Sequence, residues 1–239
     1  RTYALPRAWR QRWGLRRFGF HGLSHGWAAR RGPQLAGVPD DARIVTCHLG
    51  AGASLCAITG GRSVDTTMGF TPLDGLVMAT RSGAVDPGLL LWLITDAGLT
   101  AEEVVDGLEH DAGLAGLAGG GGDLRAVLAA RADGDTDAVL AFDVYAGRLR
   151  QGIAAMTASL GGIDLLVFTG GVGEHAAEVR AAAADALGFL GLALDTGANA
   201  TTTGDADITG AGATVRTVVV ASREDLEIAR QVRQVLDRR

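Results

Sequence analysis

The sequence predicts an α/β fold in which a mixed β-sheet is flanked by helices. Apolar, β-branched runs bounded by glycine or polar residues lie at 44–46, 164–169 and 215–220, and each predicts a strand. The last two runs are each followed by a segment with helical periodicity. The chain has 239 residues, of which 47% are hydrophobic and 21% charged, so it can bury a sizeable core.

The composition argues against several classes of protein. No apolar run reaches the roughly 18 residues that a membrane-spanning helix needs, and no secretory leader is recognisable. The net charge of -5 argues against a dedicated nucleic-acid binder, although arginine and aromatic residues are dense in residues 1–31. Cys47 and Cys56 lie in apolar runs and are expected to be buried thiols of a cytoplasmic protein. We therefore expect neither a nucleic acid nor a membrane as partner.

The first forty residues contain a short predicted helix, between Pro6 and a turn at Gly14, and then a pair of histidines. His21 and His25 are four residues apart beside glycines, so both rings could face the same way at the start of a helix. They could be metal ligands, an acid and a base, or a structural pair satisfied by hydrogen bonds. No third ligand lies nearby in the sequence, as a metal site would normally need.

Residues 41–67 predict an antiparallel meander of three strands, with turns at 48–54 and at 60–61. The first turn has the sequence HLGAGAS. Its glycines let backbone N–H groups approach a phosphate closely, so it predicts a phosphate-binding loop. An ordinary hairpin turn is the alternative interpretation.

Residues 68–75 contain too many breakers for a regular element, and Arg81 follows in a segment rich in glycine and serine. A guanidinium in such a loop suits bidentate binding of a phosphate or a carboxylate. The alternative is a loop arginine that pairs with Asp86.

Two helices are predicted after this loop. Pro87 can open a helix that runs through Leu93, and Thr100 with Glu103 forms a capping box for a helix that ends near His110. Residues 111–122 are nearly all Gly, Ala and Leu and predict a flexible loop.

Two further helices are expected, one capped by Asp123 and running through Arg131, and a long one from Asp137 to Leu160. The long helix carries apolar residues at spacings of four and three, which predicts a stripe that faces either the core or a partner chain. The stripe consists of Phe142, Ala146, Leu149, Ile153, Met156 and Leu160.

The C-terminal part contains two strand-to-helix units. In the first, the strand at 164–169 is followed by a glycine turn at 170–175 and a helix at 176–187, an arrangement suited to a nucleotide. In the second, Ser222 and Asp225 resemble a capping pair. Glu224 either favours this helix N-terminus or supplies an oxygen ligand for magnesium. The apolar face expected to point inward consists of Leu226, Ala229, Val232 and Leu236.

Each motif is weak alone, but their order is specific. FGFHGLSH at 18–25 is followed by HLGAGAS at 48–54, SVDTTMGFTPLDGLVMATRSGAVDPG at 63–88 and GDLR at 122–125. FTGGVGEHAAEVR at 168–180 and SREDLEIAR at 222–230 complete the series. This ordered set resembles the acetate kinase family, and the resemblance covers nearly the whole chain.

The resemblance implies the sugar kinase, Hsp70 and actin type of ATPase fold, which is ribonuclease H-like. It implies reversible transfer of the γ-phosphoryl group of ATP to acetate or another short-chain carboxylate, giving an acyl phosphate and ADP, with Mg2+. It also implies a homodimer. Residues 1–40 would be the segment that crosses from a preceding N-terminal domain, and residues 41–239 the C-terminal nucleotide-binding kinase domain.

Residue roles follow from the same resemblance. His21 would steady the phosphoryl group during transfer, and Arg81 would hold the acyl and transferring groups. Phe20 and Pro72 match positions that line the acyl pocket, His25 is the second histidine of its motif, and Glu224 matches a magnesium-linked glutamate. Nucleotide binding is implied for His48, Leu49, Gly50, Ala51 and Gly52, for Asp123, Leu124 and Arg125, and for Gly171, Val172, Gly173, Glu174 and His175.

The chain departs from the family at Ala51, His175 and Arg223, each of which stands in place of an asparagine. A lost neutral hydrogen bond costs on the order of 1 kcal/mol, so weaker nucleotide binding is expected. In the family the preceding domain supplies another phosphate loop, an arginine and the catalytic aspartate, so this chain alone is expected to transfer little or no phosphate. Propionate or butyrate kinase activity, or an inactive nucleotide-binding or dimerisation remnant, are the alternatives.

Overall fold

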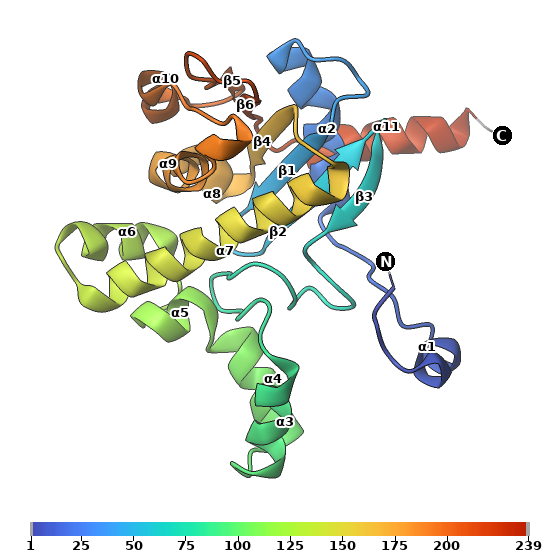
Figure 1. Cartoon of the computed structure of the whole chain (residues 1–239), viewed down its shortest axis with the longest axis vertical. Helices are drawn as coiled ribbons and strands as arrows, with labels where there is room; N and C mark the ends of the chain where they lie inside the picture. The colour runs from blue at the N-terminus through green and yellow to red at the C-terminus, as the bar shows by residue number, and fades with distance from the viewer. Residues whose placement is uncertain (1, 238–239) are drawn as a thin grey trace. The chain divides into compact units, whose positions relative to one another are not determined.

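The computed structural model describes residues 2–237 (Figure 1). The chain divides into two compact units. Each unit is assembled from segments that alternate along the chain. Unit 1 comprises Arg1–Phe20, Ala51–Ala53 and Thr67–Gly152, and unit 2 comprises His21–Gly50, Ser54–Thr66 and Ile153–Arg239.

A six-stranded mixed sheet, formed almost entirely by unit 2, has the strand order β3-β2-β1-β4-β6-β5. β4 pairs in parallel with both β1 and β6, whereas the pairs β2–β3 and β5–β6 are antiparallel. The mixed sheet and the strands predicted from the sequence are confirmed. The strands are β1 (Ile44–Leu49), β2 (Ala53–Thr59), β3 (Arg62–Thr66), β4 (Leu165–Thr169), β5 (Ala206–Asp207) and β6 (Arg216–Val219).

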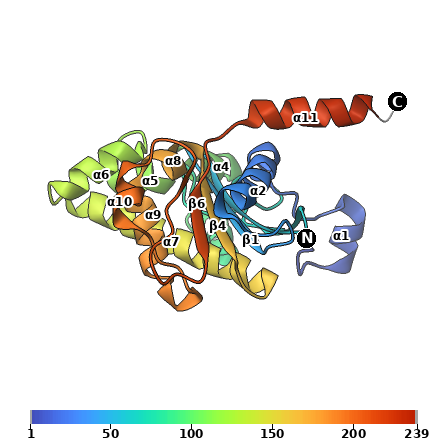
Figure 2. The ribbon, with the colours of Figure 1, turned by 90° about the horizontal axis from the view of Figure 1, so that it is seen from above.

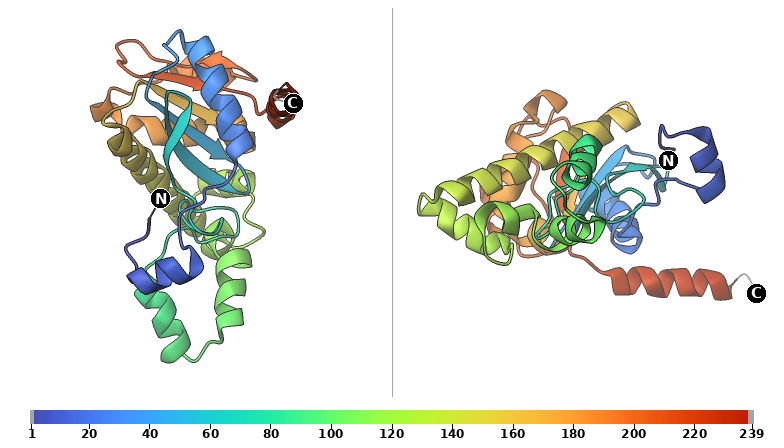
Figure 3. Two further views of the ribbon diagram at one scale, coloured as in Figure 1. Left: turned by 90° about the vertical axis from the view of Figure 1, so that its right-hand side faces the viewer. Right: turned by 90° about the horizontal axis from the view of Figure 1, so that it is seen from below.

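Helix α2 (Gly22–Ala36) covers one face of this sheet (Figures 2 and 3). Its buried Ala28 and Ala36 pack with apolar side chains of β1, β2, β4 and β6. Gly32 permits the close approach, because a Cβ at this position would lie 2.8 Å from Cγ2 of Val167. The start of α2 is therefore held at a defined place in unit 2.

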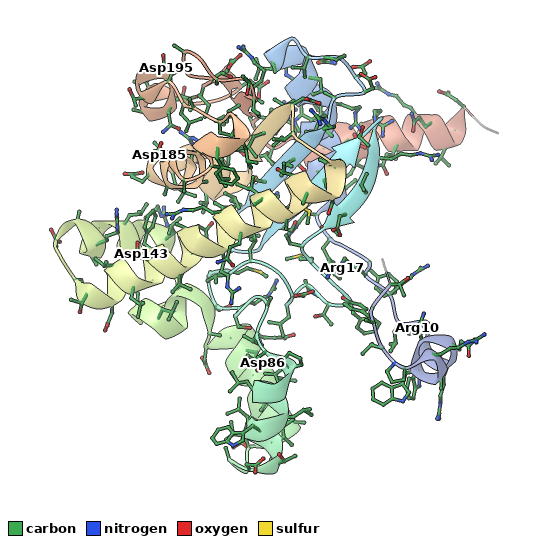
Figure 4. The ribbon with its side chains drawn as sticks, in the orientation of Figure 1. Arg10, Arg17, Asp86, Asp143, Asp185 and Asp195 are labelled. Carbon is green, nitrogen blue, oxygen red and sulfur yellow. The ribbon has the colours of Figure 1, made fainter. Side chains whose placement is uncertain are left out.

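Strand β4 continues directly into helix α8 (Gly170–His175), so the prediction of an open glycine turn at 170–175 is wrong. Gly170, with φ 79°, turns the chain at the end of the strand, and the next residues close into a helix. After α8 the chain forms α9 (Ala177–Asp185), the 3-10 turn η1 (Gly188–Leu190) and α10 (Thr196–Thr201). Asp195, labelled in Figure 4, caps α10 by accepting a hydrogen bond from the Ala198 amide.

Helix α11 (Glu224–Leu236) corrects two predictions. Arg223 is its N-cap residue and no side chain caps it, so the expected Ser222 and Asp225 capping pair does not form. The expected inward face is exposed, with Leu226 41% and Val232 51% accessible. The helix is instead attached to α2 by Glu227, which is 1% exposed and pairs with Arg30.

Unit 1 contains α1 (Arg7–Trp13), α3 (Pro87–Thr95), α4 (Ala101–His110), α5 (Gly113–Ala118) and α6 (Leu124–Ala132). Both hydrogen bonds of the predicted capping box between Thr100 and Glu103 are present. Asp86, labelled in Figure 4, caps α3 through the Gly88 amide. The helix starts predicted from Pro87, Thr100 and Asp123 are confirmed.

The flexible loop predicted for residues 111–122 is wrong over α5. Leu114 is buried, and its amide donates to the Met78 carbonyl. The Ala115 amide donates to the Ala79 carbonyl. Alanine and leucine form helices readily, and these distant hydrogen bonds hold the segment that the glycine content suggested would be flexible.

The long helix α7 (Thr136–Leu160) has the predicted extent, with residues in both units. Its stripe residues Phe142, Ala146, Leu149, Ile153 and Met156 are buried, so the stripe belongs to the core and is not an exposed dimer seam. Neither α7 nor any other described helix has the combination of length and apolarity needed to cross a membrane.

Candidate active site

Three segments that carry predicted nucleotide or magnesium residues lie at the ends of neighbouring parallel strands of unit 2. His48 and Leu49 end β1 and Gly50 follows it, Gly171–His175 follow β4, and Glu224 lies just after β6. Because β1, β4 and β6 are parallel neighbours, their carboxyl ends lie at one edge of the sheet. In open α/β sheets this edge is where ligands bind.

Direct contacts connect the three segments. Gly170 approaches β1 so closely that a Cβ at this position would lie 2.7 Å from the Leu49 carbonyl oxygen. The Glu174 carboxylate accepts a hydrogen bond of 2.9 Å from the Ser222 amide, two residues before Glu224. Unit 2 therefore brings together residues that are more than a hundred positions apart in the sequence.

Arg180, on α9, holds the backbone of α8. The residue is 1% exposed, and its guanidinium donates to the carbonyls of Gly173 and Glu174, each at 2.9 Å. It also donates to the side chain and the carbonyl of Asn199, each at 2.7 Å. The buried guanidinium of Arg180 therefore holds the predicted adenosine segment in place through hydrogen bonds to backbone and amide oxygens.

His21 is the N-cap residue of α2 and has φ 57°, the only positive φ among the described residues other than glycine. Such a backbone conformation costs of order 1 kcal/mol and persists where the surroundings determine it. The His21 ring stacks on His48, with centroids 4.2 Å apart. The strained residue thus lies beside the phosphate-loop candidate.

Serine and threonine hydroxyls link the histidines. His25 contacts Thr46 Oγ1 at 2.7 Å through Nδ1 and Ser54 Oγ at 2.8 Å through Nε2. Ser54 Oγ is also 2.9 Å from Nδ1 of His21. His48 forms a separate pair, with Nδ1 2.8 Å from Ser24 Oγ. We call His21, His25, His48 and these hydroxyl residues the histidine cluster.

Burial makes the cluster unfavourable for added positive charge. It lowers the pKa of His25 to about 3, with smaller effects of the same sign from His48 and His21. It also lowers the pKa of His48. His25 is therefore neutral at neutral pH and can accept a hydrogen bond at one ring nitrogen.

Unit 1 gathers other predicted residues around the backbone of residues 78–81. The Ala79 amide donates to the Ala51 carbonyl at 3.2 Å, and a Cβ at Gly122 would lie 2.1 Å from the Ala79 carbonyl oxygen. Gly113 has φ 63° and approaches the carbonyls of Met78 and Arg81. The second half of the HLGAGAS turn, Arg81 and the GDLR motif thus belong to one cluster.

Arg81 does not form the pair with Asp86 that the sequence offered as an alternative. Its Nη1 lies 3.9 Å from Met78 Sδ, a weak acceptor, and it makes no ion pair among the described residues. Asp86 instead caps α3. The guanidinium of Arg81 is thus available to an anion, as the bidentate interpretation requires.

In the GDLR motif, Asp123 caps α6 by accepting from the Arg125 amide, and its carboxylate also pairs with the Arg125 guanidinium. Leu124 between them is buried. The Arg125 guanidinium lowers the pKa of Asp123. The two charged side chains are exposed, so a ligand can reach them.

Phe20 and Pro72, the predicted acyl-pocket residues, are half-buried in unit 1 and belong to segments that touch. The amides of Phe18 and Gly19 donate to the Gly69 carbonyl. Arg17, labelled in Figure 4, donates to the Thr67 carbonyl and pairs with Asp74. These contacts hold the segment around Pro72 beside the chain that leads to Phe20.

These residues fit a magnesium ion only if a bound nucleotide supplies further ligands. Among the described residues, no group of three or more His, Cys, Asp or Glu side chains is placed to hold a metal ion. Glu224 is half-buried, and its carboxylate makes no ion pair within the described part of the chain. One free carboxylate suits Mg2+, which is commonly held by one or two carboxylates together with phosphates and waters.

The model of the Acetokinase family matches residues 1–230. This chain belongs to that family. It is 50% identical over 238 residues to an acetate kinase of Gloeobacter violaceus, covering 99% of this chain and 58% of the relative. The chain thus spans less than two thirds of the length of the curated relatives it matches.

Solved structures agree with the family assignment. The crystal structure of Porphyromonas gingivalis acetate kinase superposes with a TM-score of 0.94 at 37% identity, covering 98% of this chain and 59% of that chain. A propionate kinase from Francisella tularensis gives 0.88 at 34% identity, covering 95% and 58%. The predicted acetate kinase type of fold is confirmed.

The residues predicted from the motifs thus fall into two groups. Unit 2 brings together His21, the 48–50 segment, the 171–175 segment and Glu224, and unit 1 holds Phe20, Ala51, Gly52, Pro72, Arg81 and the 123–125 segment. Sequence reasoning missed Ser54, Thr46 and Arg180. The only sign of Ser54 and Arg180 in the sequence was that they are the last residues of the HLGAGAS and FTGGVGEHAAEVR motifs.

Proposed function

We propose that this acetokinase-family chain is the C-terminal part of an acetate kinase. The enzyme would transfer the γ-phosphoryl group of ATP to acetate and, in reverse, the phosphoryl group of acetyl phosphate to ADP. The observation that carries the proposal is the meeting of His48–Gly50, Gly171–His175 and Glu224 at the carboxyl ends of three parallel strands. Residues 1–40 are proposed as a crossing segment and residues 41–239 as the C-terminal kinase domain.

In the proposed reaction an acetate oxygen attacks the γ-phosphorus of ATP, the new O–P bond forms, and the bond to the β–γ bridging oxygen breaks to release ADP. Negative charge is spread over the equatorial oxygens during this transfer. His21 supplies an N–H donor to these oxygens, and Arg81 supplies a planar guanidinium that can also hold the acetate carboxylate. Mg2+, when bound with the nucleotide, would neutralise phosphate charge, with Glu224 as the residue that holds it.

Nucleotide binding is proposed for the 48–52 segment, for Asp123–Arg125 and for Gly171–His175. The exposed position of His175 at the end of α8 and the exposed salt bridge between Arg125 and Asp123 leave each of these segments open to a ligand. Phe20 and Pro72 are proposed to line the acyl pocket. The similarity to a propionate kinase makes propionate the first competing acceptor to compare with acetate.

A homodimer and a cytoplasmic location are also proposed, with no nucleic-acid or membrane partner. Both cysteines are buried and neither forms a disulfide, which suits a reducing compartment. Support for self-association comes from α3, whose apolar residues are exposed in unit 1.

The test measures acyl phosphate, trapped as the hydroxamate, from ATP, Mg2+ and either acetate or propionate. Two proteins are compared, the 239-residue chain and a longer chain that includes the coding sequence upstream of Arg1. Activity is expected in the longer chain. His21→Ala and Arg81→Ala should each reduce its kcat/KM by about a hundredfold or more, because each removes a group that binds developing charge.

Exposed residues provide matched controls, since His110→Ala and Arg148→Ala remove the same side-chain types outside the proposed site. Both should retain full activity. An inactive longer chain, or active His21→Ala and Arg81→Ala variants, would contradict the proposed function and favour a nucleotide-binding or dimerisation remnant.

A further inference from the structure

Ser54 lies between two histidine rings of unit 2. Its Oγ is 2.8 Å from His25 Nε2 and 2.9 Å from His21 Nδ1, and the residue is fully buried on β2. A serine hydroxyl has one hydrogen, so it can donate to one of these nitrogens while it accepts from the other. The direction of this hydrogen bond determines which nitrogen of His21 carries a proton.

Thr46, on the far side of His25, indicates the direction. Its Oγ1 donates to the Cys56 carbonyl at 3.4 Å and is 2.7 Å from His25 Nδ1. While Thr46 donates to the carbonyl, its oxygen accepts from His25 Nδ1–H. The neutral His25 ring then has its lone pair at Nε2, facing Ser54. If the hydrogen bonds between Thr46, His25 and Ser54 all ran in the opposite direction, the Thr46 hydroxyl would donate to His25 and the Cys56 carbonyl would lose its donor.

We propose that Ser54 is a positioning residue that keeps hydrogen on Nδ1 of His21. Ser54 donates its hydroxyl hydrogen to His25 Nε2 and accepts from His21 Nδ1–H. Nε2 is then the ring nitrogen at which His21 can gain or lose a proton. The same direction also suits the imidazolium form, which is a donor at both nitrogens.

Neighbouring groups leave this arrangement intact. His48 stacks on His21, but its Nδ1 contacts Ser24 Oγ, a hydroxyl that belongs to α2. A second proton on His25 would reverse the direction at Ser54, and the burial of His25 beside His21 and His48 opposes that protonation. Ser54 and Ser24 thus act on two different histidines.

The tautomer can be measured in the 239-residue chain by long-range 1H–15N NMR of the imidazole rings, near neutral pH. His21 is expected to show a protonated-type nitrogen at Nδ1, and the charge state of its ring decides whether Nε2 is of the protonated type as well. Ser54→Ala should shift His21 toward the tautomer mixture of a free imidazole. Ser54→Thr keeps the hydroxyl and should preserve the wild-type pattern.

Two serine variants serve as controls. Ser63→Ala changes an exposed serine of the neighbouring strand β3 and should leave all three rings unchanged. Ser24→Ala should change His48 and leave the His21 tautomer as it is. A wild-type His21 without a hydrogen on Nδ1, or a Ser54→Ala spectrum identical to the wild type, would overturn the proposal.

The kinetic consequence rests on the proposed function. In the longer chain, Ser54→Ala is expected to lower kcat for acetyl phosphate formation about tenfold with little change in the KM for acetate, because the donor to the phosphoryl group loses its orientation. Ser54→Thr should restore most of the kcat. If His21→Ala is fully active, the proposed role of His21 fails while the tautomer measurement still decides the inference about Ser54.

Discussion

At the scale of single residues, His25 couples the stability of unit 2 to pH. Its pKa is about 3 in the folded chain and near the ordinary value of 6.5 when unfolded. Below pH 6.5 the unfolded chain therefore binds a proton that the folded chain does not. The stabilising effect is complete above pH 6.5 and is lost as pH falls toward 3.

This sign predicts that the free energy of unfolding, measured by urea titration, falls by roughly 2 kcal/mol from about pH 7 to about pH 5 through His25 alone. His25→Gln keeps an amide that can donate and accept but does not titrate, so the fall should shrink by that amount. His110→Gln, at an exposed position, should keep the wild-type dependence. Parallel pH profiles for the wild type and His25→Gln would contradict a neutral, buried His25.

At the scale of elements, the short helix α8 depends on a side chain from the helix that follows it. Arg180 binds the carbonyls of Gly173 and Glu174, which α8 cannot satisfy by itself so near its end. Asn199, the one asparagine in the sequence, binds Arg180. The side-chain amide oxygen and the backbone carbonyl oxygen of Asn199 both accept hydrogen bonds from the buried Arg180 guanidinium.

We expect Arg180→Met to lower the free energy of unfolding by about 3 kcal/mol or more, since several buried oxygens lose their donors. In the longer chain it should also raise the KM for ATP about tenfold, because the proposed adenosine-binding segment loses its support. Arg148→Met, at an exposed position on α7, is the matched control and should change neither value. Normal stability and normal KM for Arg180→Met would show that α8 holds its conformation without this contact.

At the scale of the whole molecule, the proposed homodimer needs an exposed apolar surface, and α3 supplies one in unit 1. Leu91 is 64% and Trp92 53% exposed, and no residue of this helix is buried. By contrast, the α7 stripe that the sequence offered as a seam is buried. Contiguous exposed apolar side chains commonly mark an interaction site.

The combined variant Leu91→Glu and Trp92→Glu is therefore expected to convert a dimer to a monomer, because two charges would be buried in the interface. Light scattering over a wide range of protein concentrations gives the mass directly. Gln151→Glu adds a charge at an exposed position of α7 and should stay dimeric. A monomeric wild type, or a dimer that survives both α3 substitutions, would exclude this surface.

Much of the local structure was predictable from the sequence because its causes are local. The capping box at Thr100 and Glu103, the Pro87 helix start and the length of α7 follow from propensity and periodicity. Predictions failed where distant contacts decide the local structure. Helix α5 is an example, because hydrogen bonds to the backbone of residues 78–79 order this segment. The exposed apolar face of α11 shows that periodicity identifies an amphipathic helix but not what covers its apolar side.

The sequence by itself determined the family, through the order of its motifs, and with it the expected fold and the candidate residues. The tertiary structure alone decided which of these side chains touch. Ser54 contacts His25 and His21, which lie 29 and 33 positions before it in the sequence. Arg180 joins the end of α8 to Asn199, which lies 19 positions after the arginine. Such contacts depend on strand register and helix packing, which arise only when the whole sheet has formed.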